Sequence, residues 1–341
     1  MQRGNFLKGV FSPSRTYIGL DIGNFNIKIA QVKKRRFSKE RVLSFAIVPI
    51  GGDKSKDRII EAIKEACKNL GLDSKKVNLS IAGPCIMMRY IIIPSMSEKE
   101  LSQSLEVELE KYIPYKGEDV VVDHRILTKL SDNQILVLLV AAERKLINER
   151  VNLIKDAGLE PQLINVDALA LIEAFRVILP RPKGVVAILD IGYQLSKLVV
   201  MEDDIPYFSR DIETGEYDII QMISEKMNID FDLAKEWGYH PKDKLKEITE
   251  IVKPGIDNLL DELFLSFEYC ERNLEKKVEQ LYLSGGGSKV KVLLESIEKN
   301  PNLKIDFWES TQGFKISPSI TNEELKEYSP LLAVAIGLAL S

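Results

Sequence analysis

The stretch Y-I-G-L-D-I-G-N-F-N-I-K-I-A (Tyr17–Ala30) sets an aspartate and a glycine in the middle of a hydrophobic run. The same pattern returns in V-V-A-I-L-D-I-G-Y-Q-L-S-K-L-V-V (Val185–Val200). Each copy predicts a strand, a tight polar turn and a second strand. Asp21 and Asp190 occupy the same place in the two copies and lie close to half a chain length apart, a spacing far longer than the unit of a solenoid repeat. We therefore predict two related domains, each of which opens with this hairpin.

The overall composition limits the class of protein. In 341 residues, a hydrophobic fraction of 45% is enough to fill the cores of two domains. A net charge of −4 argues against nucleic-acid binding, which calls for a basic surface. The three cysteines are scattered and suit a reducing cytoplasm, and the two histidines form no metal-binding cluster. The apolar runs fall short of the ~20 residues of a membrane-spanning helix, so we expect a cytoplasmic protein.

Strands alternate with helices after each hairpin. The pattern after the first copy predicts a strand at Val42–Pro49, a helix at about Lys54–Leu70 that stops at Gly71, and a strand at Val77–Ala82. The pattern after the second copy predicts a strand near Ile205–Arg210, a helix through Ile219, Ile220, Ile223 and Met227, and a long helical region at Ile256–Val278. Antiparallel hairpins joined to strand-helix-strand units indicate an α/β fold with mixed sheets.

An insert with its own punctuation lies in the first half, at roughly Cys85–Gly158. We predict a strand at Met87–Ile93, a helix that begins at the capping box Ser97-x-x-Glu100, a hairpin of Val120–Leu130 with Gln134–Ala142, and a helix at about Lys145–Ala157. The run M-M-R-Y-I-I-I-P loads both faces of its strand with large apolar side chains. The helix accounts for one face, and either the main domain or a bound peptide must cover the other.

A third landmark, L-Y-L-S-G-G-G-S-K-V (Leu281–Val290), predicts a strand, three glycines and a helix. Glycines at such a turn let the backbone approach a ligand closely, and the N-terminus of the following helix favours anions. Together with the two Asp-x-Gly hairpins, it resembles the phosphate-1, phosphate-2 and adenosine motifs of the actin-like ATPase superfamily. The resemblance implies two domains around a nucleotide cleft, in which the hairpin turns face each other and bind the phosphates of ATP.

That resemblance assigns roles to individual residues. Asp21 and Asp190 would hold Mg²⁺, usually through water, because Mg²⁺ keeps much of its hydration shell. Asp167, in I-N-V-D-A-L-A-L, lies where the superfamily positions the attacking water, although an aspartate before an apolar helical run is also a common helix N-cap or first-turn acid. The expected nucleotide contacts are Gly23, Asn24, Asn26, Lys28, Gly192, Ser196, Lys235, Glu236, Gly285, Gly286 and Gly287.

A narrower resemblance covers the chain from Tyr17 onward. The run V-N-L-S-I-A-G-P-C-I-M-M-R-Y-I-I-I-P-S-M-S-E-K-E-L, the segment E-L-E-K-Y-I-P-Y and the final P-L-L-A-V-A-I-G-L-A-L resemble the PilM family, the cytoplasmic actin-like proteins of type IV pilus assembly. The insert is then the subdomain that PilM shares with the cell-division protein FtsA. The implied limits are a tail at 1–16, a first domain at 17–180 with its insert at about 85–158, and a second domain at 181–341, of which about 209–280 is the outer subdomain and helix 330–341 returns to the first domain.

The resemblance also implies partners. PilM-like proteins bind ATP and hold the N-terminal cytoplasmic peptide of the inner-membrane protein PilN in a groove formed partly by the insert. This implies a scaffold at the cytoplasmic face of the inner membrane, peripheral to the membrane through its partners, with other pilus motor components and self-association as further candidates. The residues expected to contact the peptide are Tyr90, Ile91, Ile93, Leu101 and Leu105.

Departures from the family pattern concern the turns. Where relatives place small hydroxyl residues, this chain has Asn24-Phe25-Asn26 and Tyr193-Gln194-Leu195, and the side chains of Phe25 and Leu195 donate no hydrogen bond. ATP hydrolysis is therefore expected to be very slow or absent. Two alternatives stay open, namely a nucleotide-free scaffold of the same fold and an FtsA-like cell-division protein.

Overall fold

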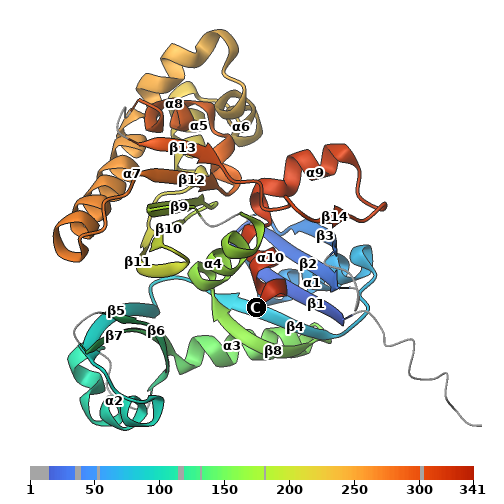
Figure 1. Ribbon diagram of the computed structural model, residues 1–341. Coiled ribbons are helices and arrows are strands. Elements are labelled where there is room, and N and C mark those ends of the chain that lie inside the picture. Colours follow the sequence, from blue (N-terminus) through green and yellow to red (C-terminus); the bar gives the residue numbers. More distant parts are fainter. Residues whose placement is uncertain are drawn as a thin grey trace, which may run out of the picture.

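The computed structural model describes residues 15–34, 40–51, 54–113, 119–130, 133–179, 182–299 and 303–341, so residues 1–14 of the predicted tail lie outside the described part. The described residues form two large sheets and one small sheet (Figure 1). Helices cover the outer faces of the large sheets and fill the layer between them. This arrangement places the two predicted hairpins opposite each other.

The two large sheets repeat one topology. The first contains β1 (Arg15–Ile22), β2 (Asn26–Lys34), β3 (Arg41–Pro49), β4 (Lys76–Ile81), β8 (Glu160–Val166) and β14 (Lys315–Ile316), in the order β14-β3-β2-β1-β4-β8. The second contains β9 (Val185–Ile191), β10 (Ser196–Glu202), β11 (Ile205–Ile212), β12 (Gln280–Ser284) and β13 (Lys304–Phe307), in the order β11-β10-β9-β12-β13. In both, an antiparallel meander continues into two parallel strands. The predicted duplication is therefore visible in the sheet connectivity.

Helix α1 (Lys56–Leu70) covers the outer face of the first sheet. The Ser55 hydroxyl oxygen accepts a hydrogen bond from the backbone N–H of Arg58, which caps the helix, and Gly71 ends it in the left-handed region at φ 60°. One face, with Ala62, Ile63 and Ala66, is buried against the sheet. The predicted helix and its glycine stop are confirmed.

Helix α3 (Arg144–Asp156) also packs on this face, beside α1. Its side chains Leu153 and Ile154 are buried in the same core as Ala62. The sequence assigns this helix to the insert, but the structure anchors it in the first domain. Its buried side chains share a core with residues of β4 and β8, and the first turn of the helix also contacts β7 of the small sheet.

The second sheet is covered by α5 (Glu216–Met227), α6 (Phe231–Tyr239), α7 (Leu245–Leu274) and α8 (Lys291–Ile297), with short 3-10 turns at Lys242–Lys244 and Gly286–Lys289. The predicted limits of α7, Ile256 and Val278, are wrong. The helix begins earlier and runs through Pro254. Proline removes one helical hydrogen bond, but the buried side chains Val252 and Ile256 on either side hold the helix to the core.

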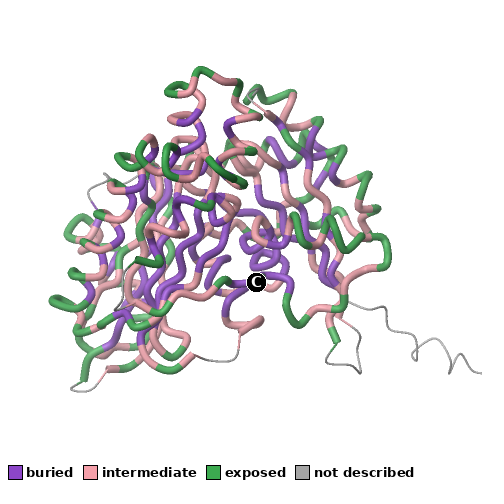
Figure 2. The backbone as a smooth tube through the Cα atoms, turned by 90° about the horizontal axis from the view of Figure 1, so that it is seen from above, coloured by how far each residue is buried: buried purple, intermediate pink, exposed green. Residues whose placement is uncertain are grey.

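Helices α4 (Asp167–Ile178) and α10 (Ala333–Leu340) form the layer between the two large sheets, at the centre of the buried residues in Figure 2. Two glycines allow close approach here. A Cβ on Gly337 would overlap the carbonyl of Ala170 in α4, and a Cβ on Gly19 would overlap the carbonyl of Ala335. The short helix α9 (Asn322–Tyr328) and the 3-10 turn Ser329–Leu331 lead into α10, which contacts β1, β2 and β4. The last helix thus packs against the strands of the first sheet.

The insert is the small sheet, β5 (Ile86–Pro94), β7 (Gln134–Glu143) and β6 (Val120–Leu130), covered by α2 (Glu98–Tyr112). The predicted capping box of Ser97 with Glu100 is present. The core of this unit contains the buried side chains Leu101, Leu105, Ile135, Val137 and Leu139. The opposite face of β5 turns toward β11, where the Tyr90 hydroxyl lies 3.4 Å from the Ser209 hydroxyl. The main body therefore covers part of that face.

Candidate functional site

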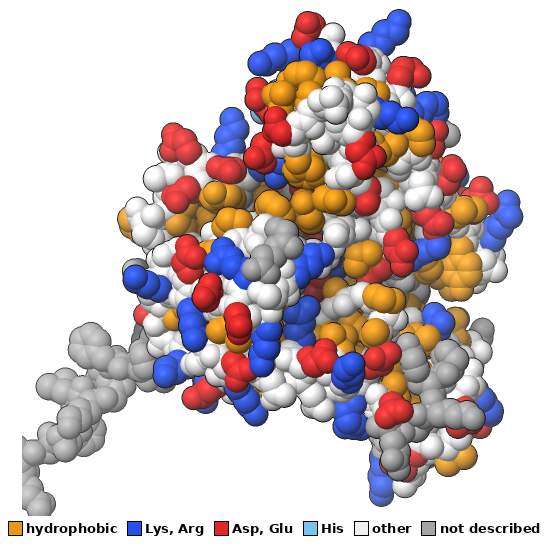
Figure 3. Space-filling view, turned by 180° about the vertical axis from the view of Figure 1, so that it is seen from behind, with side chains coloured by type: hydrophobic (Ala, Val, Ile, Leu, Met, Phe, Trp, Pro, Cys, Tyr) orange, Lys and Arg blue, Asp and Glu red, His pale blue; other side chains and the backbone are white. Residues whose placement is uncertain are grey.

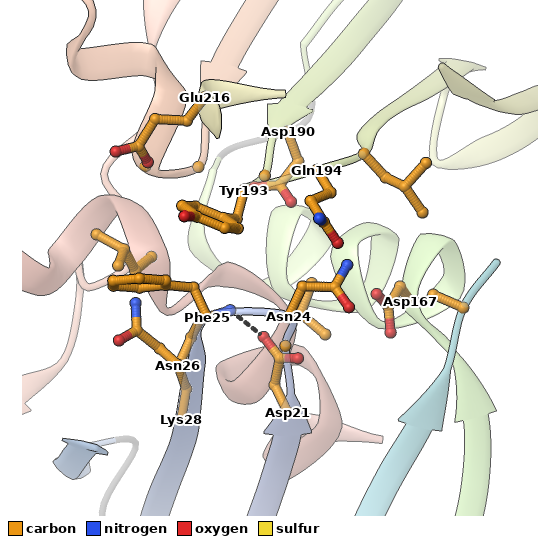
Figure 4. A pocket seen from close by; sticks show the side chains of 18 of the residues that line it. Asp21, Asn24, Phe25, Asn26, Lys28, Asp167, Asp190, Tyr193, Gln194 and Glu216 are labelled. Carbon is orange, nitrogen blue, oxygen red and sulfur yellow. Dashed lines mark hydrogen bonds and ion pairs between the residues drawn. The ribbon is translucent and has the colours of Figure 1, made fainter. Parts of the chain in front are cut away.

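A cleft of about 540 Å³ opens between the two domains, where the turns that follow β1 and β9 meet (Figure 4). Its lining comes from both halves of the chain, from α4 between them, and from the glycines after β12. The structure brings these predicted site residues to the cleft: Asp21, Gly23, Asn24, Asn26, Lys28, Asp167, Asp190, Gly192, Lys235, Gly285 and Gly286. Residues more than 260 positions apart in sequence therefore share one cavity.

The two turns are closed in the same way. The backbone N–H of Gly23 donates to the carbonyl of Asn26 over 3.1 Å, and that of Gly192 donates to the carbonyl of Leu195 over 3.1 Å. A Cβ on Gly192 would lie 2.5 Å from the Leu195 carbonyl oxygen, so any larger residue would open the turn. Tight turns of this kind direct backbone N–H groups toward the cleft, where they suit an anion.

Each turn is flanked by an aspartate and a lysine on paired strands. Asp21 lies opposite Lys28 in the β1–β2 register, and Asp190 lies opposite Lys197 in the β9–β10 register. Lys28 Nζ contacts Asp21 Oδ2 at 2.6 Å. Lys197 Nζ instead contacts Asp167 Oδ2 of α4 at 3.0 Å. The sequence analysis did not predict Lys197 as a site residue. An alignment of the two copies would have indicated it, because Lys197 follows Asp190 at the same distance as Lys28 follows Asp21.

Burial and charge balance each other at the base of the cleft. Burial raises the pKa of Asp190, and the neighbouring Lys197 and Lys28 offset part of that rise. Burial alone would lower the pKa of Lys197, but the carboxylates of Asp167, Asp190 and Asp211 outweigh it and raise the pKa above its ordinary value. Lys197 is therefore a permanent cation shared among several carboxylates.

An aromatic contact joins the two turns across the cleft. The rings of Phe25 and Tyr193 lie with centroids 4.5 Å apart, and Figure 4 shows them facing each other from opposite walls. Lys235 Nζ lies 5.4 Å from the centroid of the Phe25 ring. Lys54 Nζ also donates to the Gln194 side-chain oxygen over 2.9 Å, which ties the first domain to the second turn. The residues that depart from the hydroxyl-rich family pattern thus contact one another.

The opposite end of the cleft from Asp167 is organised by Glu216, which the sequence analysis did not single out as a contact residue. Its carboxylate is buried and accepts a hydrogen bond from the Tyr239 hydroxyl at 2.6 Å, with Lys235 Nζ at 3.1 Å. Burial, followed by the charge of Glu216, raises the pKa of Tyr239, which keeps its proton for this bond. A Cβ on Gly286 would lie 2.8 Å from Glu216, so the glycine turn and the carboxylate form one wall.

Three predicted nucleotide contacts lie away from the cleft lining. Ser196 is fully buried, and its hydroxyl donates to the Thr214 carbonyl over 2.6 Å. Glu236 points outward and lies 3.8 Å from Lys242. Gly287 is buried and packs so closely on Ile191 that a Cβ there would overlap the Ile191 side chain. Ser196 and Gly287 therefore serve the fold around the cleft, and Glu236 lies on the surface.

Magnesium would fit this cleft only together with phosphate oxygens. In the described part of the chain, no group of three or more His, Cys, Asp or Glu side chains is arranged to hold a metal ion. Asp21 and Asp190 do line the cleft, and Mg²⁺ is commonly held by one or two carboxylates plus substrate phosphates and waters. The donor set therefore suits a magnesium–phosphate complex rather than a resident ion.

A second cleft of about 310 Å³ lies between the insert and the main body. Its lining includes Met87, Met88 and Arg89 from β5, and Arg210 from β11. Of the residues predicted to contact a partner peptide, Leu101 and Leu105 lie on the buried face of α2 and Ile91 and Ile93 pack against them, while Tyr90 turns toward Ser209. Seen from behind, charged side chains of both signs cover the surface, and hydrophobic ones show where the insert meets the body (Figure 3).

Comparison with known proteins agrees with this architecture. A structure described as a PilM-PilN type IV pilus biogenesis complex superposes with a TM-score of 0.83 at 26% identity, over 96% of this chain and 98% of that one. The ethanolamine utilization protein EutJ from Carboxydothermus hydrogenoformans gives 0.54 at 14% identity, over 96% and 90%. A diol dehydratase-reactivating factor gives 0.54 at 10% identity, over 96% and 99%. The last two matches concern the fold alone.

Together these findings confirm the predicted fold and family. The mixed α/β architecture with its duplicated sheets is the actin-like ATPase fold. Within the described residues, no helix is long and apolar enough to cross a membrane. The family model of the type IV pilus assembly protein PilM matches residues 19–341. The chain therefore belongs to the PilM family of type IV pilus assembly proteins.

Proposed function

We propose that this protein is an ATP-binding scaffold of type IV pilus assembly, located at the cytoplasmic face of the inner membrane, that holds the N-terminal cytoplasmic peptide of a PilN-type protein. The observation that supports nucleotide binding is the cleft in which both Asp-x-Gly turns and the glycine turn converge. The similarity to a PilM-PilN complex at 26% identity over nearly the whole chain supports the partner.

Residues at one end of the cleft suit phosphate. Backbone N–H groups of the Gly23 and Gly192 turns and the ammonium of Lys28 would bind phosphate oxygens. Asp21 and Asp190 would accept hydrogen bonds from magnesium-bound waters. At the other end, Glu216 and Lys235 line the space for ribose and base. When bound, Mg²⁺-ATP would supply the phosphoanhydride for any phosphoryl transfer.

Hydrolysis is expected to be slow. Asp167 is the candidate for orienting an attacking water, but its carboxylate already contacts Lys197 at 3.0 Å. To orient a water, this carboxylate would have to give up its contact with Lys197, and positioning supplies most of the catalysis of phosphoryl transfer. We expect the protein to bind ATP but to hydrolyse it more slowly than several molecules per second. A coupled phosphate-release assay measures this rate directly.

The partner peptide fits the second cleft best. The lining of this hollow includes the apolar residues Met87 and Met88 and the charged residues Arg89, Arg210 and Glu213. An extended peptide could bury a few side chains there, and each fully buried aliphatic side chain contributes roughly 1.5–3 kcal/mol before ordering costs. The predicted contacts Leu101 and Leu105 would then act indirectly, by holding β5 in place.

Nucleotide binding is tested by thermal unfolding with Mg²⁺-ATP. A ligand that binds only the folded state adds about 2.7 kcal/mol at 100 times its Kd. Mg²⁺ alone and ATP without Mg²⁺ are the controls. The absence of any stabilisation at millimolar Mg²⁺-ATP would favour the alternative function, a nucleotide-free scaffold in which the Phe25–Tyr193 contact joins the domains in place of phosphate.

The peptide site is tested by measuring the binding of a PilN-type N-terminal peptide to Met87→Asp and Arg89→Glu variants. We expect both to weaken binding, because both residues line the second cleft. Val107→Asp is the matched control, since Val107 is exposed on α2 of the same insert and away from that cleft. Equal affinities in all variants would remove this cleft from the partner site.

A further inference from the structure

Arg150 brings a guanidinium group to the cleft from a direction that the hairpins do not provide. It lies midway along α3 and lines the cleft together with Asp21, Asp167 and Lys197. The helix is fixed behind it, because Leu153 and Ile154 are buried in the first domain's core. The side chain therefore extends into the cleft from a rigid support.

The charged neighbours of Arg150 already have partners. Asp21 contacts Lys28 at 2.6 Å, and Asp167 contacts Lys197 at 3.0 Å. Both carboxylates act on Arg150 through their charge, but within the described residues neither forms a hydrogen bond or an ion pair with it. Burial lowers the pKa of Arg150 first, and these carboxylates partly restore it, so the group stays charged.

Arg150 is a half-buried guanidinium with no hydrogen-bond acceptor among the described residues, and such a group favours the binding of an anion. Removing such a group from water is unfavourable unless hydrogen bonds replace the lost hydration. Its N–H donors form a planar fork that matches two oxygens of a phosphate group, which a lysine ammonium cannot do. The chemistry of Arg150 therefore fits a phosphate that enters the cleft.

The end of the cleft at which Arg150 lies indicates which phosphate of a nucleotide it would contact. In Figure 4, Asp167 and Glu216 lie at opposite ends of the group of labelled side chains, with Tyr193 between them. Glu216 belongs to the wall that contains the glycine turn, where ribose and base would lie. Arg150 belongs with Asp167, at the end that the last phosphate of a nucleotide would reach.

We propose that Arg150 binds the terminal phosphate of a nucleoside triphosphate and distinguishes it from a diphosphate. This assignment deepens the proposed nucleotide-binding function and rests on it. Arg150 is then the third cation at the phosphate end, beside Lys28 and Lys197. Unlike the two lysines, it contacts no carboxylate among the described residues that it would have to give up when phosphate binds, so its hydrogen bonds are a net gain.

The test compares Mg²⁺-ADP with a non-hydrolysable Mg²⁺-ATP analogue by calorimetric titration of the full chain. Variants are Arg150→Met, Arg150→Lys and the control Lys155→Met, which removes one positive charge from an exposed position on the same helix. We expect Arg150→Met to weaken the triphosphate by about tenfold to a hundredfold, the range for hydrogen bonds to charged groups, and to leave the diphosphate nearly unchanged. Arg150→Lys should fall between it and the wild type, and Lys155→Met should match the wild type.

Unchanged diphosphate affinity in Arg150→Met also shows that the variant is folded. Equal losses for both nucleotides, or no loss for either, would overturn the assignment of Arg150 while leaving nucleotide binding in place. A wild-type chain that binds neither nucleotide would overturn both the proposed function and this inference. Should Arg150→Met fail to fold, Arg150→Lys decides, because a lysine with full triphosphate affinity would rule out recognition by the guanidinium fork.

Discussion

The first and second hairpins carry the same aspartate and lysine at the same register, yet the lysines have different partners. Lys28 contacts the aspartate of its own hairpin, whereas Lys197 contacts Asp167 of α4. The duplicated strands place an aspartate opposite a lysine in both hairpins. Helix α4, which connects the two halves, adds Asp167 and so changes the partner of Lys197. The comparison teaches that a repeat in sequence predicts symmetric backbones but not symmetric electrostatics.

The largest expected effect concerns the cation of the second hairpin. Lys197→Met would leave Asp167, Asp190 and Asp211 without their shared positive charge. Removing one partner of a buried ion pair costs about 3–5 kcal/mol, so we expect a loss of that order in the free energy of unfolding, measured with urea. Lys28→Met should cost less, because the charge of Lys197 acts on Asp167, Asp190 and Asp211, whereas that of Lys28 acts on Asp21 and Asp190. Equal losses would show that the two hairpins are electrostatically equivalent after all.

The aspartates sharpen the comparison through ligand binding. If both carry the magnesium-bound waters of a nucleotide, Asp21→Ala and Asp190→Ala should each weaken Mg²⁺-ATP by up to about a hundredfold, the upper range for hydrogen bonds to charged groups. Isothermal titration measures the affinity. Asp261→Ala, at an exposed position on α7, is the control. Wild-type affinity in either hairpin variant would exclude that aspartate from the magnesium site.

The aromatic contact between the turns gives a smaller effect. Aromatic pairs contribute about 0.5–1.5 kcal/mol beyond their buried area, so a double-mutant cycle of Phe25→Ala and Tyr193→Ala should give a coupling energy in that range. The rings lie 4.5 Å apart and come from different domains, so the coupling reports domain closure. Additive stability changes would mean that the cleft opens in solution and separates the rings.

The smallest effect is a pH dependence. Because the folded protein raises the pKa of Asp190 above its ordinary value of 3.8, the folded state binds more protons than the unfolded state between that value and the raised pKa. Stability from this group is therefore lost as pH rises through the window. We expect Asp190→Asn to remove this dependence, so that its stability relative to wild type improves from acid to neutral pH in urea titrations, whereas Asp261→Asn should run parallel to wild type.

Local patterns in the sequence predicted the frame of this molecule. The hairpins, the Gly71 stop and the Ser97–Glu100 cap depend on neighbouring residues, and all are present. Contacts between distant elements were not predictable in the same way. Periodicity marks Ser196 as a strand residue beside a turn, but only the folded chain shows its hydroxyl on the Thr214 carbonyl instead of in the cleft.

The same limit applies to the insert and to the charges. An apolar stripe says that Leu101 and Leu105 are buried, and it does not say whether protein or peptide buries them. Lys197 stood in a quoted motif and Glu216 did not, and the importance of both comes from Asp167 and Tyr239, which reach them from other elements. Tertiary packing decides which side chains contact each other across the two domains, and the spacing of residues in the sequence does not predict that packing.

The place of α10 has a consequence for how the chain is made. Residues 333–340 complete the core of the first domain, although the whole second domain precedes them in the sequence. A ribosome that has synthesised β1 to β8 must still synthesise the second sheet before these residues emerge. Until then, the face of β1 around Gly19 stays uncovered, because the backbone of α10 packs directly on it in the folded protein. The nascent chain thus carries an unfinished N-terminal domain, open to holding chaperones, until synthesis reaches α10.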